Sequence, residues 1–303
     1  MRFKKIFLLI CIISLLNISA YSAVAGNVKE TKKIDNLNKS DRNGFFKQSL
    51  TVVVVGGPAE SCHKRTAKRV VDIYGNLGYN VKYLIRPSLD EMENTITSWI
   101  PNNIGGAKKL ALYFIDHGST FGFSLGRDLL TPDDLGSWMN EISSYYSSCL
   151  LFVEACFSGV FITDELSANN RIIITSTGPY TSSFKDPSDE SFFAKVFLNG
   201  LEEGDSYGQA WMRADEYIDS PPFSLLFSQQ NPKIDDNGDG EGHGTNFPNS
   251  LPIGGDGSYA LGLSPKYKAK TNSKLSLDKN QFPILNRLIK HSFLKDLFKE
   301  ILN

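Results

Sequence analysis

The chain has 303 residues, of which 41% are hydrophobic and 21% are charged, and its formal net charge is −1. This composition is that of an ordinary globular protein and argues against a chain without a folded core. The near-zero net charge gives no argument for binding nucleic acid or an acidic membrane surface.

The first 25 residues have the pattern of a secretory signal peptide. A basic start (residues 2–5) precedes a mostly apolar run of eleven residues (6–16), which is too short to span a bilayer comfortably. The small-x-small sequence at 23–25 supplies a cleavage site. We therefore expect an exported protein, secreted or periplasmic, that loses residues 1–25; a retained membrane anchor is the alternative. No other stretch of the sequence has the length and hydrophobicity of a membrane span.

The next residues, 26–48, are polar and charged, and we expect a flexible N-terminal segment there. Residues 49–263 then alternate apolar runs with segments of helical spacing. Strands are predicted at 49–57, 79–85, 109–118, 149–159 and 171–178, and helices at 63–78, 88–100, 131–146, 189–201 and 206–218. Ser88, with Glu91 three residues later, marks one helix start. This alternation predicts an α/β protein, a three-layer α/β/α sandwich with a mainly parallel sheet.

Two reactive residues follow successive predicted strands. His117 ends the third strand and Cys156 ends the fourth. Successive strands usually neighbour each other, and ligands bind beyond the carboxyl ends of parallel strands, so we expect both side chains on one rim. A cysteine thiolate is a nucleophile, and a nearby histidine can move its proton. The amides of Gly118 and Cys156 are the natural donors to an oxyanion. The alternative to catalysis is a structural role, in which Cys156 is a packed core cysteine and Asp116 and His117 form a surface turn.

These residues lie in two motifs, YFIDHG at 113–118 and LFVEACFSG at 151–159. Together they resemble the paired signature of legumain-type cysteine peptidases, within the caspase-like group. The resemblance covers roughly residues 50–220 and includes the stretches VVVVGGPAESCH and GDSYGQAW. It implies a caspase-like fold, a His117–Cys156 catalytic dyad with Gly118 in the oxyanion hole, a peptide or protein substrate, and no cofactor for catalysis.

The same resemblance implies a pocket for the substrate residue before the cleaved bond. Carried over by motif, its members are His63, Glu154, Ser182 or Ser183, and Asp205. Two positions depart from the family, with Cys62 in place of an arginine and Glu60 in place of an asparagine. Carboxylates without a fixed cation favour cleavage after Arg or Lys, with Asn as the alternative. Lys64 or Arg65, reaching back into the pocket, would restore the cation.

Three cysteines remain after signal removal, and an odd number leaves at least one free thiol. Cys62 follows the end of one strand whereas Cys149 begins another, which places them on opposite rims, too far apart for a disulfide. We expect Cys149 to be a buried core thiol. Cys62 is expected to line the catalytic rim or to oxidise reversibly with Cys156.

A second constellation lies at 235–246. Asp235, Asn237 and Asp239 occupy positions one, three and five of an EF-hand-like loop, and the backbone of Glu241 would supply position seven. Position twelve lacks the usual glutamate. A structural calcium site and a Gly-Asp surface turn are therefore the alternatives.

The tail, residues 264–303, is a lysine-rich polar linker followed by an amphipathic segment. We expect this helix to pack on its own domain; a removable inhibitory segment and a membrane-surface contact are the alternatives. The whole sequence predicts an exported cysteine endopeptidase that works through an acyl-enzyme. A transpeptidase with the same dyad and a catalytically silent binding protein on the same fold are the rival interpretations.

Overall fold

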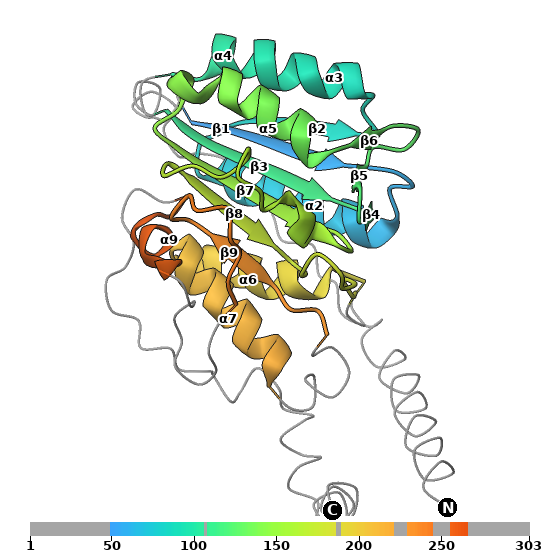
Figure 1. The fold of residues 1–303 in the computed structure, drawn as a ribbon, viewed down its shortest axis with the longest axis vertical. Coiled ribbons are helices and arrows are strands. Elements are labelled where there is room, and N and C mark those ends of the chain that lie inside the picture. The colour runs from blue at the N-terminus through green and yellow to red at the C-terminus, as the bar shows by residue number, and fades with distance from the viewer. Residues whose placement is uncertain (1–48, 106–107, 186–188, 221–228, 245–254, 266–303) are drawn as a thin grey trace, which may run out of the picture. The chain divides into compact units, whose positions relative to one another are not determined.

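The computed structural model describes residues 49–105, 108–185, 189–220, 229–244 and 255–265 (Figure 1). The predicted signal peptide, the segment 26–48 and all but two residues of 264–303 lie outside the described residues. None of the described helices has the length and hydrophobicity needed to cross a membrane.

A six-stranded sheet forms the centre of the described structure (Figure 1). Its order is β2 (Asn80–Ile85), β1 (Leu50–Val55), β3 (Lys109–Ile115), β7 (Ser148–Glu154), β8 (Arg171–Thr175) and β9 (Lys233–Asp235). The first five strands are parallel and β9 is antiparallel to β8. The predicted mainly parallel sheet is confirmed, and β9 is an addition that the sequence pattern did not indicate.

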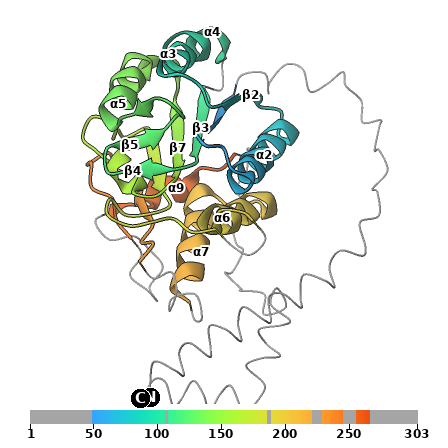
Figure 2. The ribbon, with the colours of Figure 1, turned by 90° about the vertical axis from the view of Figure 1, so that its right-hand side faces the viewer.

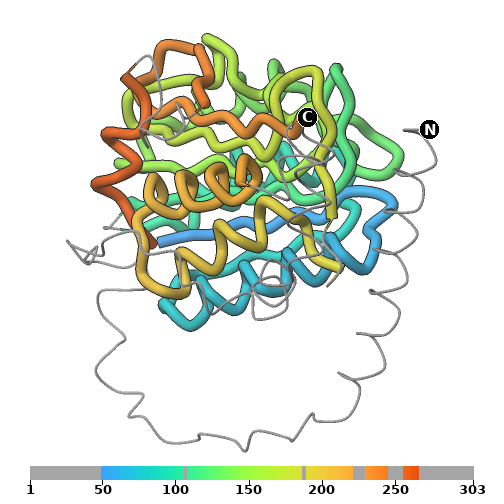
Figure 3. Tube along the Cα trace, turned by 90° about the horizontal axis from the view of Figure 1, so that it is seen from below, coloured from blue at the N-terminus to red at the C-terminus, as the bar shows by residue number. Residues whose placement is uncertain are grey.

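Helices cover both faces of this sheet, as predicted (Figure 2). One face carries α2 (Ser61–Asn76), α6 (Phe192–Glu203), α7 (Tyr207–Asp219) and α9 (Ser258–Gly262). The other carries α3 (Leu89–Asn94), the π-helix η1 (Thr95–Trp99), α4 (Ile100–Asn103), α5 (Pro132–Glu141) and the 3₁₀ turns η2 (Ser143–Tyr145) and η3 (Ser158–Phe161). Strand side chains alternate between the two cores: Val53 and Val55 contact the first, and Val52 and Val54 contact the second. Figure 3 shows α2, α6 and α7 side by side across the first face.

The helix starts follow the predicted chemistry. Ser88 Oγ accepts a hydrogen bond from the Glu91 amide at 3.1 Å, which satisfies an otherwise unpaired donor at the start of α3. Thr131 and Asp134 cap α5 reciprocally. The predicted single helix at 88–100 differs in one respect, because five of its residues form a π-helical turn.

A small antiparallel sheet follows β3 directly. It consists of β4 (Gly118–Ser119), β5 (Gly122–Ser124) and β6 (Leu129–Leu130). Phe123 and Leu130 are buried in the core beneath α5. This sheet was not predicted, since two- and three-residue strands show no usable periodicity. It fixes the backbone that leaves the carboxyl end of β3.

Candidate active site

The carboxyl ends of β3 and β7 lie side by side. The two strands are parallel, with Ile115 opposite Glu154, and the Asp116 amide donates to the Glu154 carbonyl at 3.1 Å. His117 and Cys156 therefore leave the sheet from adjacent strand ends and line one cavity. The expectation that both lie on one rim is confirmed.

Gly118 is the point where these two strand ends meet. A Cβ atom at this position would lie 2.3 Å from the Cys156 carbonyl oxygen and 3.1 Å from Ala155 Cβ. Real Cβ contacts are essentially never as short as the first of these, so only glycine fits without a shift of the backbone. The absence of a side chain thus lets the chain after His117 approach Cys156 closely.

The loop after β8 supports Cys156 from the other side. The Ser183 amide donates to Cys156 Sγ at 3.4 Å, and the Phe157 amide donates to the Thr181 carbonyl at 2.8 Å. Phe157 has a left-handed backbone with φ of 60°, which turns the chain sharply at the thiol. Cys156 is only partly buried, whereas Cys62 and Cys149 are buried.

The other two thiols have the properties expected of core cysteines. Burial raises the pKa of Cys149 to about 12, and burial also raises the pKa of Cys62. Both are free cysteines, and each lines a different cavity, at opposite ends of the strands. The prediction that Cys149 is a buried core thiol unable to pair with Cys62 is confirmed.

Asp116 organises the histidines of the site. Its carboxylate is fully buried and accepts hydrogen bonds from the amides of Ala59, at 3.0 Å, and His117, at 2.8 Å. Its Oδ1 lies 3.3 Å from His63 Nδ1 and 3.9 Å from His117 Nε2. The imidazole of His117 is half exposed and also lies 3.5 Å from Glu60 Oε1. Sequence reasoning treated Asp116 only as part of a turn, although its place beside a rim histidine was the available signal.

The cavity beside the thiol has a volume of about 130 Å³. It is lined by Glu60, Cys62, His63, Asp116, His117, Glu154, Cys156, Ser183, Phe184, Lys185 and Ser191. Of the residues predicted for the substrate pocket, His63, Glu154 and Ser183 lie here. Ser182 is exposed and is not among the lining residues, so Ser183 is the serine of this pocket.

Glu154, like Asp116, is a fully buried acid of the cavity. Its Oε1 accepts a short hydrogen bond from Ser183 Oγ, and its Oε2 accepts one from the Ala194 amide in the first turn of α6 at 3.0 Å. Burial raises the pKa of Glu154, while these hydrogen bonds, which favour the charged form, act in the opposite direction. A buried carboxyl group that lines a small cavity is suited to a substrate group that brings its own hydrogen-bond donors.

The predicted role of Asp205 in this pocket is wrong. Asp205 follows α6, which begins at the catalytic rim and extends for twelve residues, or about 18 Å, toward the opposite edge of the sheet. There its carboxylate pairs with Arg213 at 2.9 Å. Tyr207, two residues later, lines a cavity with Ser148 and Cys149 at the start of β7. The length of α6 therefore separates Asp205 from Cys156.

A different aspartate lies near the cavity and was missed. Asp189 accepts a hydrogen bond from Ser61 Oγ at 2.6 Å, lies 3.6 Å from Lys185 Nζ and lies 3.8 Å from Arg65. The Ser61 hydrogen bond is the main cause that lowers the pKa of Asp189. The signal in the sequence was an acidic stretch in the connection between β8 and α6, just before α6 begins.

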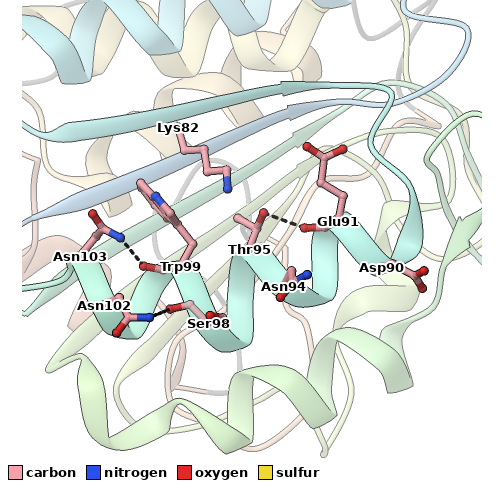
Figure 4. A pocket seen from close by; sticks show the side chains of 9 residues that line it. All are labelled: Lys82, Asp90, Glu91, Asn94, Thr95, Ser98, Trp99, Asn102 and Asn103. Atoms are coloured by element: carbon pink, nitrogen blue, oxygen red, sulfur yellow. Dashed lines mark hydrogen bonds between the residues drawn. The ribbon is translucent and has the colours of Figure 1, made fainter.

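A larger hollow of about 550 Å³ lies elsewhere, over β2 and the helices α3 to α4 (Figure 4). Three of its polar side chains donate to backbone carbonyls one turn earlier: Thr95 to Glu91, Asn102 to Ser98 and Asn103 to Trp99. Lys82 lies over the Trp99 ring at 4.9 Å. These contacts stabilise the π-helical turn, and none of the described residues that line the hollow is a cysteine or a histidine.

Two groups of side chains at the catalytic rim bring three ligand atoms within 4.8 Å of one another. They are Glu60, Cys62 and His63, and His63, Asp116 and His117. Imidazole nitrogens with carboxylate oxygens suit Zn²⁺. The same atoms would be needed for proton transfer, so metal binding and catalysis would compete at this rim.

The loop expected to bind calcium forms a tight turn. The buried carboxylate of Asp235 accepts hydrogen bonds from Ser167 Oγ and from a backbone amide of the loop. Asp239 accepts from the Glu241 amide at 2.8 Å and from Asn237 Nδ2 at 2.8 Å. The Glu241 side chain is exposed. The carboxylates of Asp235 and Asp239 thus accept hydrogen bonds from other groups of the same turn. Calcium binding at this loop stays a prediction.

Comparison with known proteins finds a similarity over the same part of the chain. The model of the Peptidase C13 family matches residues 105–216, which include both strand ends and the motifs at 113–118 and 151–159 but not the stretch at 52–63. A search of curated proteins found no match. Among solved structures, the chain is similar to caspase-1 from Spodoptera frugiperda, with 13% identity, a TM-score of 0.47, and coverage of 63% of this chain and 86% of that one. The family match indicates an enzyme, a cysteine-type endopeptidase.

Proposed function

From the premise of a legumain-like cysteine peptidase, we propose that the chain is an exported endopeptidase whose catalytic dyad is Cys156 and His117. The observation that carries this proposal is their position on adjacent parallel strand ends, where both line one cavity. The partial exposure of Cys156 also supports it, because the other two described cysteines are buried. Export rests on the signal-peptide pattern of residues 1–25.

The residues divide the chemistry between them. The Cys156 thiolate attacks the peptide carbonyl, and the amides of Gly118 and Cys156 stabilise the oxyanion. His117 takes the thiol proton and delivers it to the leaving amine. Water then releases the acyl group from Cys156. Asp116 acts as a positioning residue, since it accepts a hydrogen bond from the His117 amide and lies within 4 Å of both imidazoles.

The cavity composition supports cleavage after Arg or Lys. Glu60, Asp116 and Glu154 all line it, and a cationic substrate side chain would reduce the repulsion between their carboxylates. Neither Lys64 nor Arg65 is among the lining residues, and Arg65 lies instead beside Asp189. The one lysine among the described residues that line the cavity, Lys185, lies 3.6 Å from Asp189, which offsets its charge. Asp205 has no part in this preference. Asparagine remains the alternative residue before the cleaved bond.

Fluorogenic peptides that differ only in the residue before the cleaved bond test the proposal. We expect hydrolysis after Arg and Lys, weaker hydrolysis after Asn, and none after Asp. Cys156→Ala should abolish hydrolysis, and the matched variant Cys149→Ala should retain it with a modest loss of stability. Hydrolysis that persists in Cys156→Ala, or a preference for Asn over Arg, would contradict the dyad or the specificity respectively.

The proposed export has its own test. Expression of the full chain in a host with a secretion pathway should release a mature protein whose first residue is Gly26. Intact-mass measurement of the purified product identifies the new N-terminus. A product that retains residues 1–25 and fractionates with membranes would support the retained anchor instead.

A further inference from the structure

A short hairpin begins one residue after His117 and ends in an exposed aromatic ring. β4 pairs with β5, and Ser119 Oγ both accepts from the Phe121 amide, at 3.2 Å, and donates to the Gly122 carbonyl, at 3.4 Å. Gly122 has φ of 149° and lies so close to the Leu130 carbonyl that a Cβ would be 2.2 Å from it. The turn is therefore held on the small sheet rather than projecting freely.

Phe121 stands out against its neighbours in this hairpin. Its ring is 75% exposed, whereas Phe123, two residues later on the same hairpin, is fully buried. A single exposed aromatic residue is not unusual on a protein surface. Its position relative to the reacting atoms is what gives it a role.

The chemistry of amide cleavage fixes which part of the substrate lies beside this hairpin. The general acid must reach the nitrogen that leaves, so the substrate chain beyond the cleaved bond departs on the His117 side of Cys156. The β4–β5 hairpin continues directly from β3 and His117, whereas the loop with Tyr180 follows β8, the neighbour of β7 on the side away from β3. The leaving part of the substrate therefore passes along the hairpin.

The distances match the second or third residue after the cleaved bond. Extended chains advance about 3.3 Å per residue, so the four residues from His117 to Phe121 span at most about 13 Å. Because the chain turns at residues 120–121, the Cα of Phe121 lies nearer to His117 than this limit. An extended substrate covers about 7 to 10 Å in two to three residues.

We infer that Phe121 forms an apolar subsite for the second or third substrate residue on the leaving-group side. This inference rests on the proposed function. The substrates that fit are peptides carrying a bulky apolar side chain, such as Leu, Phe or Met, at one of these positions. The ring is presented by a fixed turn, so contact with such a side chain removes apolar surface from water on both partners without ordering the hairpin.

Pairs of internally quenched peptides test the inference. Each pair shares Arg before the cleaved bond and differs only in Leu or Ser at the second or the third following position. The unmodified protein should cleave the Leu peptide of the responsive pair with a kcat/KM about tenfold higher. The ratio should fall to about one in Phe121→Ser and be restored in Phe121→Leu. Because both peptides meet the same preparation, the ratio does not depend on the folded fraction.

Tyr180→Ser is the matched control. Tyr180 is 83% exposed on the loop that follows β8 and not on the β4–β5 hairpin, and its loss should leave the ratio at about tenfold. Equal cleavage of both members of both pairs by the unmodified protein would overturn the inference and leave the proposed function standing. A tenfold ratio that persists in Phe121→Ser would also overturn the inference alone. Failure to cleave any peptide, with no labelling of Cys156, would overturn both.

Discussion

Gly118→Ala is the substitution that the geometry of the rim makes most informative. A Cβ atom would lie 2.3 Å from the Cys156 carbonyl oxygen, and ordinary contact begins at 3.4 Å, so the backbone must open by about 1.1 Å. The clashing atom belongs to the backbone and cannot rotate away. The shift moves His117 and the Gly118 amide relative to the thiol.

Both a stability and a rate effect follow. Inserting a methyl group into a tightly packed contact costs about 1–3 kcal/mol in the free energy of unfolding. A displacement of about 1 Å at the reacting groups lowers the rate by about a hundredfold. We therefore expect kcat to fall by about two orders of magnitude while the protein still folds.

The assay combines peptide hydrolysis with chemical denaturation of the same preparations. Gly75→Ala is the matched control, because a Cβ at Gly75 in α2 meets no atom within 4 Å. That variant should gain about 0.5–1 kcal/mol of stability from its higher helix propensity and keep its kcat. Unchanged kcat and stability in Gly118→Ala would refute the close packing of the two strand ends.

Glu154, Asp205 and the two rim histidines each give a further prediction. Burial raises the pKa of Glu154, so its contribution to stability is present below the ordinary carboxyl pKa and is lost as pH rises through the folded value. The unfolding free energy of the unmodified protein minus that of Glu154→Gln should therefore fall with rising pH; a flat difference would contradict this. Asp205→Asn should lower stability by about 1 kcal/mol, through the weakened Arg213 pair, and leave the ratio of Arg to Asn cleavage unchanged, whereas a changed ratio would return Asp205 to the pocket. Zn²⁺ should inhibit hydrolysis reversibly, with activity restored by a chelator, because possible ligand atoms of His63, Asp116 and His117 lie within 4.8 Å of one another. Inhibition of equal strength in His63→Ala would argue against this site.

The central fold could be predicted because its strands are long, apolar and separated by helices of ordinary length. The run at Leu50–Val55 is buried throughout, as a strand covered on both faces must be. The adjacency of His117 and Cys156 followed from the same reasoning, since it needs only the strand order and a parallel sheet. The short strands β4, β5, β6 and β9 could not be predicted from the sequence pattern, because their pairing depends on tertiary contacts.

The pocket was predicted less well, for a reason that the path of the chain explains. His63, Glu154 and Ser183 lie within a few residues of a strand end or helix start on the rim, so their motif neighbours fix their place. Asp205 is separated from the rim by the full length of α6. A motif match alone does not reveal such a displacement. Asp116 was underestimated because its role, accepting two amides from different loops, is visible only in the folded structure.

Covalent labelling of Cys156 tests the central claim most directly. Cys62 and Cys149 are buried with raised pKa values, so a peptidyl acyloxymethyl ketone ending in Arg should modify one thiol. Mass spectrometry of the labelled protein should find a single adduct on Cys156, formed much more slowly in His117→Ala and absent in Cys156→Ala. An adduct on Cys62 or Cys149, or labelling of His117→Ala at the unmodified rate, would contradict the proposed dyad.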